Sequence, residues 1–529
     1  MSDNSNTAVQ RAPDVLEVQG RRPAYNAQPG YPLSQGRLAA GFKAFAHRLL
    51  ERGAKVWLID GMVGVDWGTV RAGLQAALAG HNAAFRDVQG PGGFAIDRAA
   101  GNVELVLCIG QGSAMLPVKA ARACVWSAGI LPAPGAAAIG RNPWAGGTPA
   151  LHSCQDLYVD MSDPANPVLI EGAALRATLA AMSRRPFRVK PVFYSTVWGG
   201  QWLKQRLSLD QDRPNCGGSY EFLASENSVL LQDHGLRIEV PFDLLMAQEA
   251  VNIQGAELTE RFSTEFPIRL NLTDTIQGGD LSCQVHPLPD YAWREFGHRY
   301  PEHETYYVLA ADKGAQINLG LREGLDPGAF RHVAECARDA GVAFDTGQYV
   351  NAWPSHAHDV FHVPAGTVHN IGAGNLVLEI ISSSLMHTLR IYDHLRTDSR
   401  GRRRQVHIQQ AWDNIDFCRQ TRWVRENLIP SPRMVRCGEG WTEIAFGGLP
   451  FLPYAVHRAD FEHVFTDDTG GERFHLLHMV EGEEALVEWD GGNHLLHFAE
   501  TLLVPAATGP YRLHNQARGV CKVLKVYVW

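Results

Sequence analysis

The sequence predicts a mixed fold: an N-terminal α/β domain followed by two β-rich domains with a small helical insertion. Three observations predict it. Before about residue 185, buried-strand patterns alternate with helical ones, which is typical of a sheet covered by helices. After that point, short alternating apolar runs are separated by Gly, Pro, Asp and Asn, which indicates β-sandwiches or barrels. Residues 326–341 interrupt these runs with one helical pattern.

The N-terminal third divides into two parts. Residues 1–40 are rich in Pro, Gly, Asn and Gln, which predicts a flexible N-terminal arm or a segment draped over the rest of the protein. Residues 41–185 form the predicted α/β domain. Its clearest elements are strands at 55–60 and 104–109 and helices at 69–78 and 173–183.

The rest of the chain is predicted to be β-rich. At about 150 residues per domain, 529 residues suggest three or four domains. We therefore place one β-rich domain at 186–425 and a second at 426–529. Strands are expected at 229–232, 306–309, 315–319, 360–363, 376–380, 474–479, 484–489, 495–498, 501–504 and 520–528.

Residues 56–74 (VWLIDGMVGVDWGTVRAGL) resemble the opening of a P-loop kinase, with a strand, a glycine turn and a helix. A working P-loop needs Gly-Lys-Ser/Thr so that backbone N–H groups and the lysine hold phosphates. Here Asp66, Trp67 and Gly68 stand at those positions, and an aspartate repels phosphate. The segment therefore predicts a degenerate P-loop-like domain with a packing role.

Composition and charge exclude several classes of protein. The 48 basic and 56 acidic residues give a net charge of −8, which argues against a nucleic-acid partner. No apolar run approaches the roughly 20 residues of a spanning helix, so no membrane partner is expected. The N-terminus lacks the apolar centre of a signal peptide. Nine scattered cysteines without a CxxC pair indicate a reducing compartment, and a cytoplasmic location is expected.

One group of residues has the chemistry of a metal site. Gln284 and His286 lie two apart on an expected strand, so both side chains point to one face. Glu304 begins another expected strand, and His369 follows a Pro-Ala-Gly turn. Two imidazoles, a carboxylate and an amide oxygen suit zinc or another divalent ion. The chain has 22 histidines, so the spacing alone also fits a chance grouping.

A series of segments around these residues carries a resemblance to a known family. They are PVFYSTVWGG (191–200), GGSYEF (217–222), DLSCQVHPLPDYA (280–292), ETYYVL (304–309), DVFHVPAGTVHNIGAG (359–374), LVLEI (376–380), LRIYD (389–393) and RQVHIQQAWDNI (404–415). In this order, over about residues 186–425, they resemble the type I mannose-6-phosphate isomerases, which are zinc-dependent cupins. A less distinct match at 499–513 is similar to the family's second cupin half.

The resemblance implies a fold, a cofactor and a reaction. The implied fold of both β-rich domains is the cupin, or jelly roll, and the first domain is expected to bind one Zn2+ per chain. The implied activity is the interconversion of mannose 6-phosphate and fructose 6-phosphate, or of a related sugar phosphate, through an enediol. Glu379 matches an acidic active-site residue, and Arg390 matches an arginine near the reacting carbons. The implied zinc ligands are Gln284, His286, Glu304 and His369.

The sequence departs from the family pattern at two places. Many members carry a lysine two residues before the glutamate ligand, whereas this chain has Glu302, which reverses the charge. Glu379 and Arg390 are also separated by one residue more than is usual. The complete ligand set favours an enzyme. Glu302 favours the alternative, a non-catalytic cupin that binds a sugar or sugar phosphate as a sensor or accessory protein.

Overall fold

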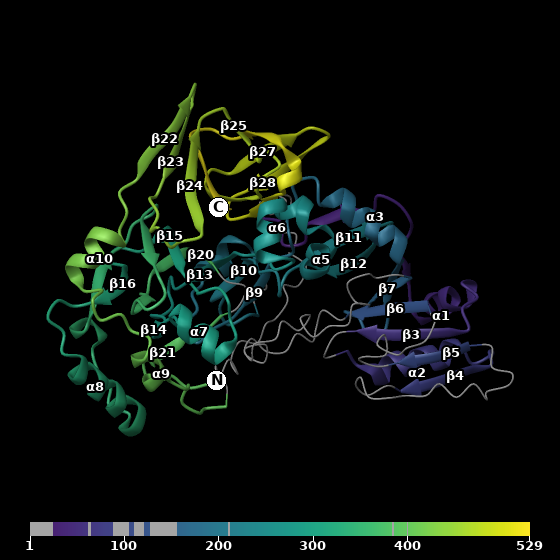
Figure 1. Ribbon diagram of the computed structural model, residues 1–529, viewed down its shortest axis with the longest axis horizontal. Coiled ribbons are helices and arrows are strands. Elements are labelled where there is room, and N and C mark those ends of the chain that lie inside the picture. The colour runs from purple at the N-terminus through teal and green to yellow at the C-terminus, as the bar shows by residue number, and fades with distance from the viewer. Residues whose placement is uncertain are drawn as a thin grey trace.

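The structure is a computed structural model that describes residues 25–61, 65–87, 105–109, 121–126, 156–209, 212–382, 386–398 and 400–529. It is a mixed, strand-rich fold, as the sequence predicts (Figure 1). Six sheets are formed by the described strands. None of the described helices is long and apolar enough to cross a membrane.

The N-terminal sheet has seven strands in the order β2-β8-β7-β6-β3-β5-β4. Five neighbouring strands, β3 to β7, run parallel, and β2 and β8 are antiparallel additions at one edge. The predicted strands and helices of this part are confirmed to within two residues. The elements are β2 Ala39–Ala40, α1 Phe42–Glu51, β3 Val56–Gly61, α2 Trp67–Ala77, β4 Ala83–Asp87, β5 Leu105–Ile109, β6 Ala121–Trp126, β7 Leu157–Asp160, β8 Val168–Glu171 and α3 Gly172–Met182.

The P-loop-like segment has a local structural role in its described part. Asp66 is the N-cap of α2, and its carboxylate accepts hydrogen bonds from the Thr69 backbone N–H at 3.2 Å and from the Thr69 hydroxyl at 2.7 Å. An N-cap aspartate satisfies a donor that the first helical turn leaves open. The glycine turn at residues 62–64 lies outside the described residues.

A three-stranded sheet corrects the prediction of a flexible N-terminal arm. Strand β1 (Gly30–Pro32) pairs in parallel with β11 (Ser228–Asp233), which pairs with β12 (Leu236–Pro241). Tyr25 and Tyr31 are buried, and the Tyr31 hydroxyl accepts the Arg188 backbone N–H at 2.6 Å. The prediction of a flexible arm is therefore wrong for residues 25–40, because these apolar side chains pack, and the alternative of a draped segment fits this part of the chain. Residues 1–24 lie outside the described residues.

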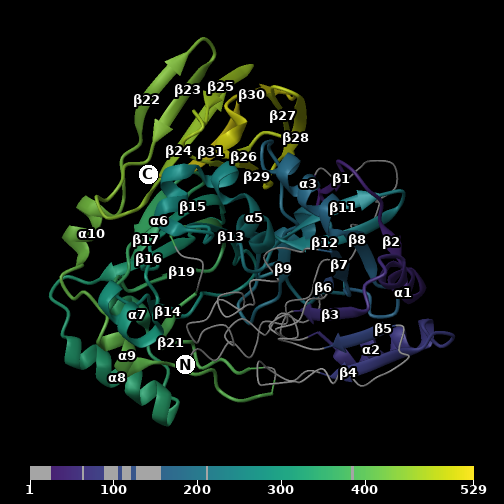
Figure 2. The ribbon, with the colours of Figure 1, turned by 45° about the vertical axis from the view of Figure 1, so that its right-hand side comes forward.

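The middle of the chain forms two facing antiparallel sheets. One has the order β18-β15-β20-β13-β10-β9 and the other β17-β16-β19-β14-β21. Figure 2 labels the strands of the second sheet in this order from top to bottom. Buried side chains of both sheets share a cluster that includes Tyr306 and Val308 of β15 and Leu319 of β16. The strands are β9 Val192–Tyr194, β10 Gly218–Phe222, β13 Arg269–Asp274, β14 Cys283–Val285, β15 Glu304–Ala311, β16 Gln316–Leu321, β17 Val350–Pro354, β18 Val360–Val363, β19 His369–Ile371, β20 Asn375–Ile381 and β21 Leu389–Tyr392.

The predicted helical insertion is confirmed as α8 (Pro327–Ala340), between β16 and β17. The Asp326 carboxylate caps its first turn, and Pro327 occupies the first helical position. Gly341 ends it with φ = 71°, a left-handed conformation that favours glycine. The other helices are α4 Trp202–Arg206, α5 Phe242–Gln254, α6 Ala256–Phe262, α7 Pro289–Phe296, α9 Ile408–Trp412 and α10 Thr421–Asn427.

The C-terminal part repeats the two-sheet arrangement. A six-stranded sheet (β22-β23-β24-β31-β26-β29) packs on a four-stranded one (β25-β30-β27-β28), and Phe461, Leu477 and Val487 lie in the shared core. The five strands predicted here are confirmed. The elements are β22 Arg433–Gly438, β23 Trp441–Ala445, β24 Tyr454–Phe461, β25 Val464–Asp468, β26 His475–Glu481, β27 Glu484–Trp489, β28 Gly492–His497, β29 Thr501–Val504, β30 Pro510–Asn515 and β31 Cys521–Val528.

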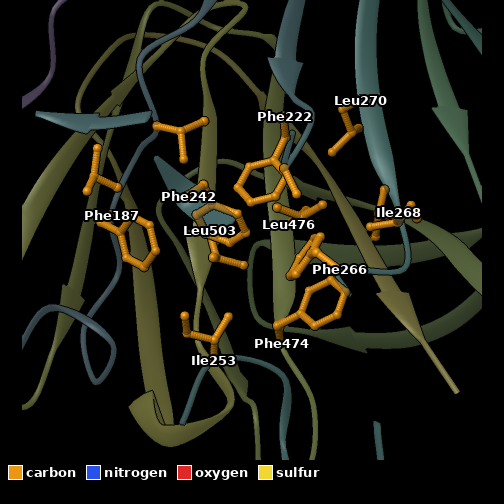
Figure 3. Packing of buried hydrophobic residues seen from close by; sticks show 14 of the residues in the cluster. Phe187, Phe222, Phe242, Ile253, Phe266, Ile268, Leu270, Phe474, Leu476 and Leu503 are labelled. Atoms are coloured by element: carbon orange, nitrogen blue, oxygen red, sulfur yellow. The ribbon is translucent and has the colours of Figure 1, made fainter. Parts of the chain in front are cut away.

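A large aromatic core joins the middle and C-terminal parts (Figure 3). Phe266 packs against Phe222 of β10 with ring centroids 4.8 Å apart, and against Phe474 at 4.5 Å. Phe242, at the start of α5, meets Phe266 edge to face. Such pairs add stability beyond the apolar area that they bury. The sheet that carries Glu304 is therefore anchored to a packed core, through Tyr307 and Leu309 of the same strand.

Candidate metal centre

The four predicted ligands come from three neighbouring strands. Gln284 on β14 stands directly opposite His369 on β19 in an antiparallel pair. His286 follows β14 immediately and shares a face with Gln284, because alternate residues of an extended strand point the same way. Glu304 is the first residue of β15 in the facing sheet. The two-sheet fold thus brings together residues that are up to 85 positions apart.

The side chains of these residues converge on one point. The distance from His286 Nε2 to Glu304 Oε2 is 3.3 Å, and that from His369 Nε2 to the same oxygen is 3.5 Å. One ligand atom from each of these three residues lies within 4.8 Å of the others. The Gln284 amide nitrogen is 3.3 Å from His369 Nε2. A half turn of the amide would present its oxygen instead.

Backbone carbonyls fix both imidazole rings. His286 Nδ1 lies 3.1 Å from the His387 carbonyl oxygen, and His369 Nδ1 lies 2.8 Å from that of Thr367. A carbonyl only accepts, so each Nδ1 carries the proton, and in the neutral ring Nε2 is left as an acceptor. Hydrogen bonds from the ring nitrogen that faces away from the metal orient histidines that bind metals.

The donor set fits a cation. His286 Nε2 and Glu304 Oε2 are buried, and neither makes a hydrogen bond within the described part of the chain. Buried acceptors that face one another are costly unless a donor or a positive charge lies between them. Two imidazole nitrogens, a carboxylate and an amide oxygen match the preferences of zinc.

Burial and neighbouring charges shift the pKa values of the histidines and of Glu304 in this site. Burial lowers the pKa of His369 to about 4, with a contribution from the charge of His286. Burial also disfavours the charged form of His286, but the carboxylates of Glu302 and Glu304 outweigh it and raise its pKa to about 9. Burial would raise the pKa of Glu304, yet His286 lowers it. In the metal-free site His286 therefore holds a second proton, on Nε2. A metal ion would compete with that proton for the lone pair of Nε2.

The two predicted catalytic residues line the same pocket, whose volume is about 160 Å³. Glu379 on β20 stands opposite Tyr306 and Asn271 in its sheet. Burial, together with the nearby charge of Glu304, raises the pKa of Glu379 to about 8. Its carboxyl group therefore carries a proton at neutral pH and can exchange it near that pH.

Arg390 lies on β21, opposite Gln284. Its guanidinium donates to the Gln405 carbonyl oxygen at 3.2 Å, and its backbone N–H donates to His407 Nδ1 at 3.2 Å. The side chain is buried and lines the pocket beside Gln284. It thus supplies a positive charge that is held by the neighbouring segment around Gln405.

Sequence reasoning missed several polar residues of the pocket. Arg269, Asn271 and Thr273 lie at alternate positions of β13 and all line the pocket. Polar residues at every second position of a strand that is buried throughout could have indicated a polar pocket on one face of that strand. Arg404 also lines the pocket, and its guanidinium pairs with Asp393 at 2.7 Å.

Glu302, the residue that departs from the family pattern, also faces this pocket. Its side chain is 3% exposed and forms an ion pair with Arg269, which is 2% exposed. Burial would raise the pKa of Glu302, but the charges of His286 and Arg269 lower it to about 2. The negative charge that the sequence introduces at this position is thus balanced by Arg269.

Comparisons with known proteins find relatives of similar sequence. No family model matches the chain. The chain is 32% identical over 229 residues to a mannose-6-phosphate isomerase of Streptococcus mutans, a match that covers 43% of this chain and 67% of that protein. It is 28% identical over 241 residues to the mannose-6-phosphate isomerase ManA of Bacillus subtilis, covering 44% of this chain and 69% of that one.

Solved structures show a shared fold. The mannose 6-phosphate isomerase of Bacillus subtilis superposes with a TM-score of 0.50 at 21% identity, covering 65% of this chain and 100% of that chain. A mutant of phosphomannose isomerase from Salmonella typhimurium superposes with a TM-score of 0.51 at 14% identity, covering 65% and 99%. At these identities the likeness concerns the fold alone.

Proposed function

This chain belongs to the mannose-6-phosphate isomerase family, and from that premise we propose that it is a zinc-dependent aldose–ketose isomerase. Its substrates would be mannose 6-phosphate and fructose 6-phosphate, which interconvert through an enediol. One observation carries the proposal: a single pocket is lined by the convergent side chains of His286 and Glu304, the buried carboxyl group of Glu379 and the guanidinium of Arg390.

The proposed metal is one zinc ion, held by Gln284, His286, Glu304 and His369. The fixed tautomers of both histidines and the unpartnered atoms of His286 and Glu304 support this assignment. When bound, zinc polarises substrate oxygens and lowers the free energy of negative charge that develops on them.

The reaction moves protons without a change in composition. From the aldose, C2 loses a proton and O1 gains one, which gives the enediol. In the second half, O2 loses a proton and C1 gains one, which gives the ketose. We assign proton transfer in this sequence to Glu379, because a group with a pKa near the working pH can both give and take a proton.

We assign Arg390 to the negative charge that accompanies this transfer. A guanidinium keeps its charge throughout the pH range and donates several N–H groups in a fixed plane. A donor that is already oriented stabilises an enediolate or a phosphate without having to reorganise. The hydrogen bond from the Arg390 guanidinium to the Gln405 carbonyl oxygen supports such a fixed orientation.

A coupled assay of purified full-length protein tests the proposal. We expect mannose 6-phosphate to be converted to fructose 6-phosphate, with about one zinc per chain by metal analysis, and a chelator should stop turnover. Zinc and sugar-phosphate binding without turnover would instead support the accessory role.

The remaining expectations rest on the same premise. We propose that residues 186–425 and 426–529 are two cupin domains and that residues 41–185 are an added α/β domain. A sugar phosphate is the proposed partner, without nucleic acid, and the cytoplasm is the proposed location. Limited proteolysis tests the domain boundaries, because cleavage concentrates in exposed linkers between domains.

A further inference from the structure

We infer that Glu302 is a positioning residue of the metal centre: it holds the ring of His286 in place through the peptide of His387, and Arg269 balances its charge. This inference rests on the proposed zinc site, but it does not depend on catalysis. It explains how the chain can carry an acidic residue beside its ligands.

The contacts of Glu302 lead to one ring nitrogen of His286. Glu302 Oε2 accepts the His387 backbone N–H at 2.7 Å, and the His387 carbonyl oxygen accepts from His286 Nδ1 at 3.1 Å. The same carboxylate oxygen lies 3.5 Å from His286 Nδ1. The Nδ1–H group thus faces a carbonyl oxygen and a carboxylate oxygen, and the carboxylate of Glu302 also holds the backbone of His387, the residue that supplies the carbonyl.

This arrangement favours metal binding at Nε2. Negative charge beside Nδ1–H makes the opposite nitrogen more basic and fixes the direction of its lone pair. Nε2 is the atom that points toward Glu304, at 3.3 Å from its carboxylate oxygen. The effect of Glu302 on a metal ion is therefore exerted through His286.

Arg269 makes the buried carboxylate tolerable. An isolated buried charge is strongly unfavourable unless an opposite charge and hydrogen bonds compensate it. The Arg269 guanidinium pairs with Glu302 Oε1, which leaves Oε2 for the His387 peptide. Oε1 of Glu302 thus forms the ion pair with Arg269, and Oε2 faces His387 and His286.

The sign of the charge at position 302 follows from these neighbours. A lysine there would set an ammonium group against the buried Arg269 guanidinium and against two N–H donors, those of His387 and His286 Nδ1. It would neither accept these hydrogen bonds nor balance Arg269. Glu302→Lys should therefore disturb the site more than the neutral Glu302→Gln.

Zinc affinity of the full-length chain tests the inference. We would measure the zinc dissociation constant by competition with a fluorescent chelator, and the visible absorption spectrum of the cobalt-loaded protein. Glu302→Gln should weaken zinc binding by about 10- to 100-fold and shift the cobalt spectrum, as other second-shell changes do. Glu426→Gln is the matched control, since Glu426 forms an exposed ion pair with Arg422 at 3.1 Å.

A second variant guards against misfolding. Should Glu302→Gln fail to fold because Arg269 is left without its carboxylate, the double variant Glu302→Gln with Arg269→Gln removes both charges together. It should bind zinc more weakly than the parent chain by a similar factor. Parent-like affinity and spectrum in either folded variant would overturn the inference, and so would a parent chain that binds no zinc. A zinc-binding parent without turnover would contradict only the isomerase proposal.

Discussion

Gln284 and His369 face each other across the β14–β19 pair, with their side-chain nitrogens 3.3 Å apart. This pairing brings two segments that are far apart in the sequence together on one side of the candidate metal site. Glu304 completes it from the opposite sheet, 3.5 Å from His369 Nε2. Each of these three residues is placed by its strand, so the geometry of the site follows from strand register.

Removal of a ligand should release the metal. His369→Ala deletes one of the two imidazoles, and we expect less than one-tenth of the parent zinc content after dialysis, because three donors hold the ion less tightly than four. Metal analysis measures the result. His356→Ala is the control, because the His356 side chain is 78% exposed. Equal zinc in the His369→Ala and control proteins would contradict the ligand assignment.

Glu379→Gln should slow the chemistry without removing the metal. The amide keeps the shape of the side chain but cannot transfer a proton. The loss in kcat should be about 10²- to 10⁴-fold, the usual contribution of a general acid or base. Steady-state kinetics and zinc analysis on one preparation provide the test, with the exposed Glu472→Gln as control. A parent-like kcat would exclude Glu379 from proton transfer.

Arg390→Met should reduce kcat/KM by about 10²- to 10³-fold, a loss typical of removing one oriented donor. Arg390→Lys should recover only part of it, because an ammonium group keeps the charge but loses the planar fork. Initial-rate measurements on both variants distinguish these effects. Full activity of the lysine variant would show that charge alone suffices.

Zinc affinity should fall on acidification. The pKa of His286 is raised to about 9 in the metal-free site, so below pH 9 zinc must displace a proton from this ring. The apparent dissociation constant should then rise about tenfold for each pH unit between 8 and 6. His369 adds nothing in this range, because its pKa is lowered to about 4. Chelator competition at pH 6, 7 and 8 measures the slope, and a flat profile would contradict it.

The aromatic core should dominate the stability of the β-rich region. Phe266→Ala removes a side chain that packs on Phe222, Phe242 and Phe474, and we expect a loss of about 3–5 kcal/mol. Denaturant unfolding followed by tryptophan fluorescence measures it. Trp293→Ala, at a side chain that is 63% exposed, should change little. A loss below about 1 kcal/mol for Phe266→Ala would contradict the packing account.

Strands and the candidate ligands could be predicted from the sequence, because strand alternation and residue type are local signals. Gln284 and His286 share a face through an i, i+2 spacing, and α8 carries its own cap and stop signals at Asp326 and Gly341. Glu304 and His369 were chosen by residue type and by the family resemblance, because their proximity to that pair depends on register between strands, which no local pattern encodes.

Other features required the three-dimensional structure. Tyr31 lies in a segment of loop-like composition, yet β1 adds to a strand about 200 positions away, which no local pattern encodes. Arg269 lies in a strand that the sequence did not single out. Its ion pair with Glu302 exists only because β13 and the start of β15 flank β20 in one sheet.

One measurement tests the central claim most directly. Mannose 6-phosphate would be incubated with the zinc-loaded full-length protein and followed by proton NMR, with the Glu304→Ala variant in parallel. We predict that the signals of mannose 6-phosphate decline as those of fructose 6-phosphate appear, and that the variant leaves them unchanged. A parent protein that holds zinc but leaves the mannose 6-phosphate signals constant would contradict the account.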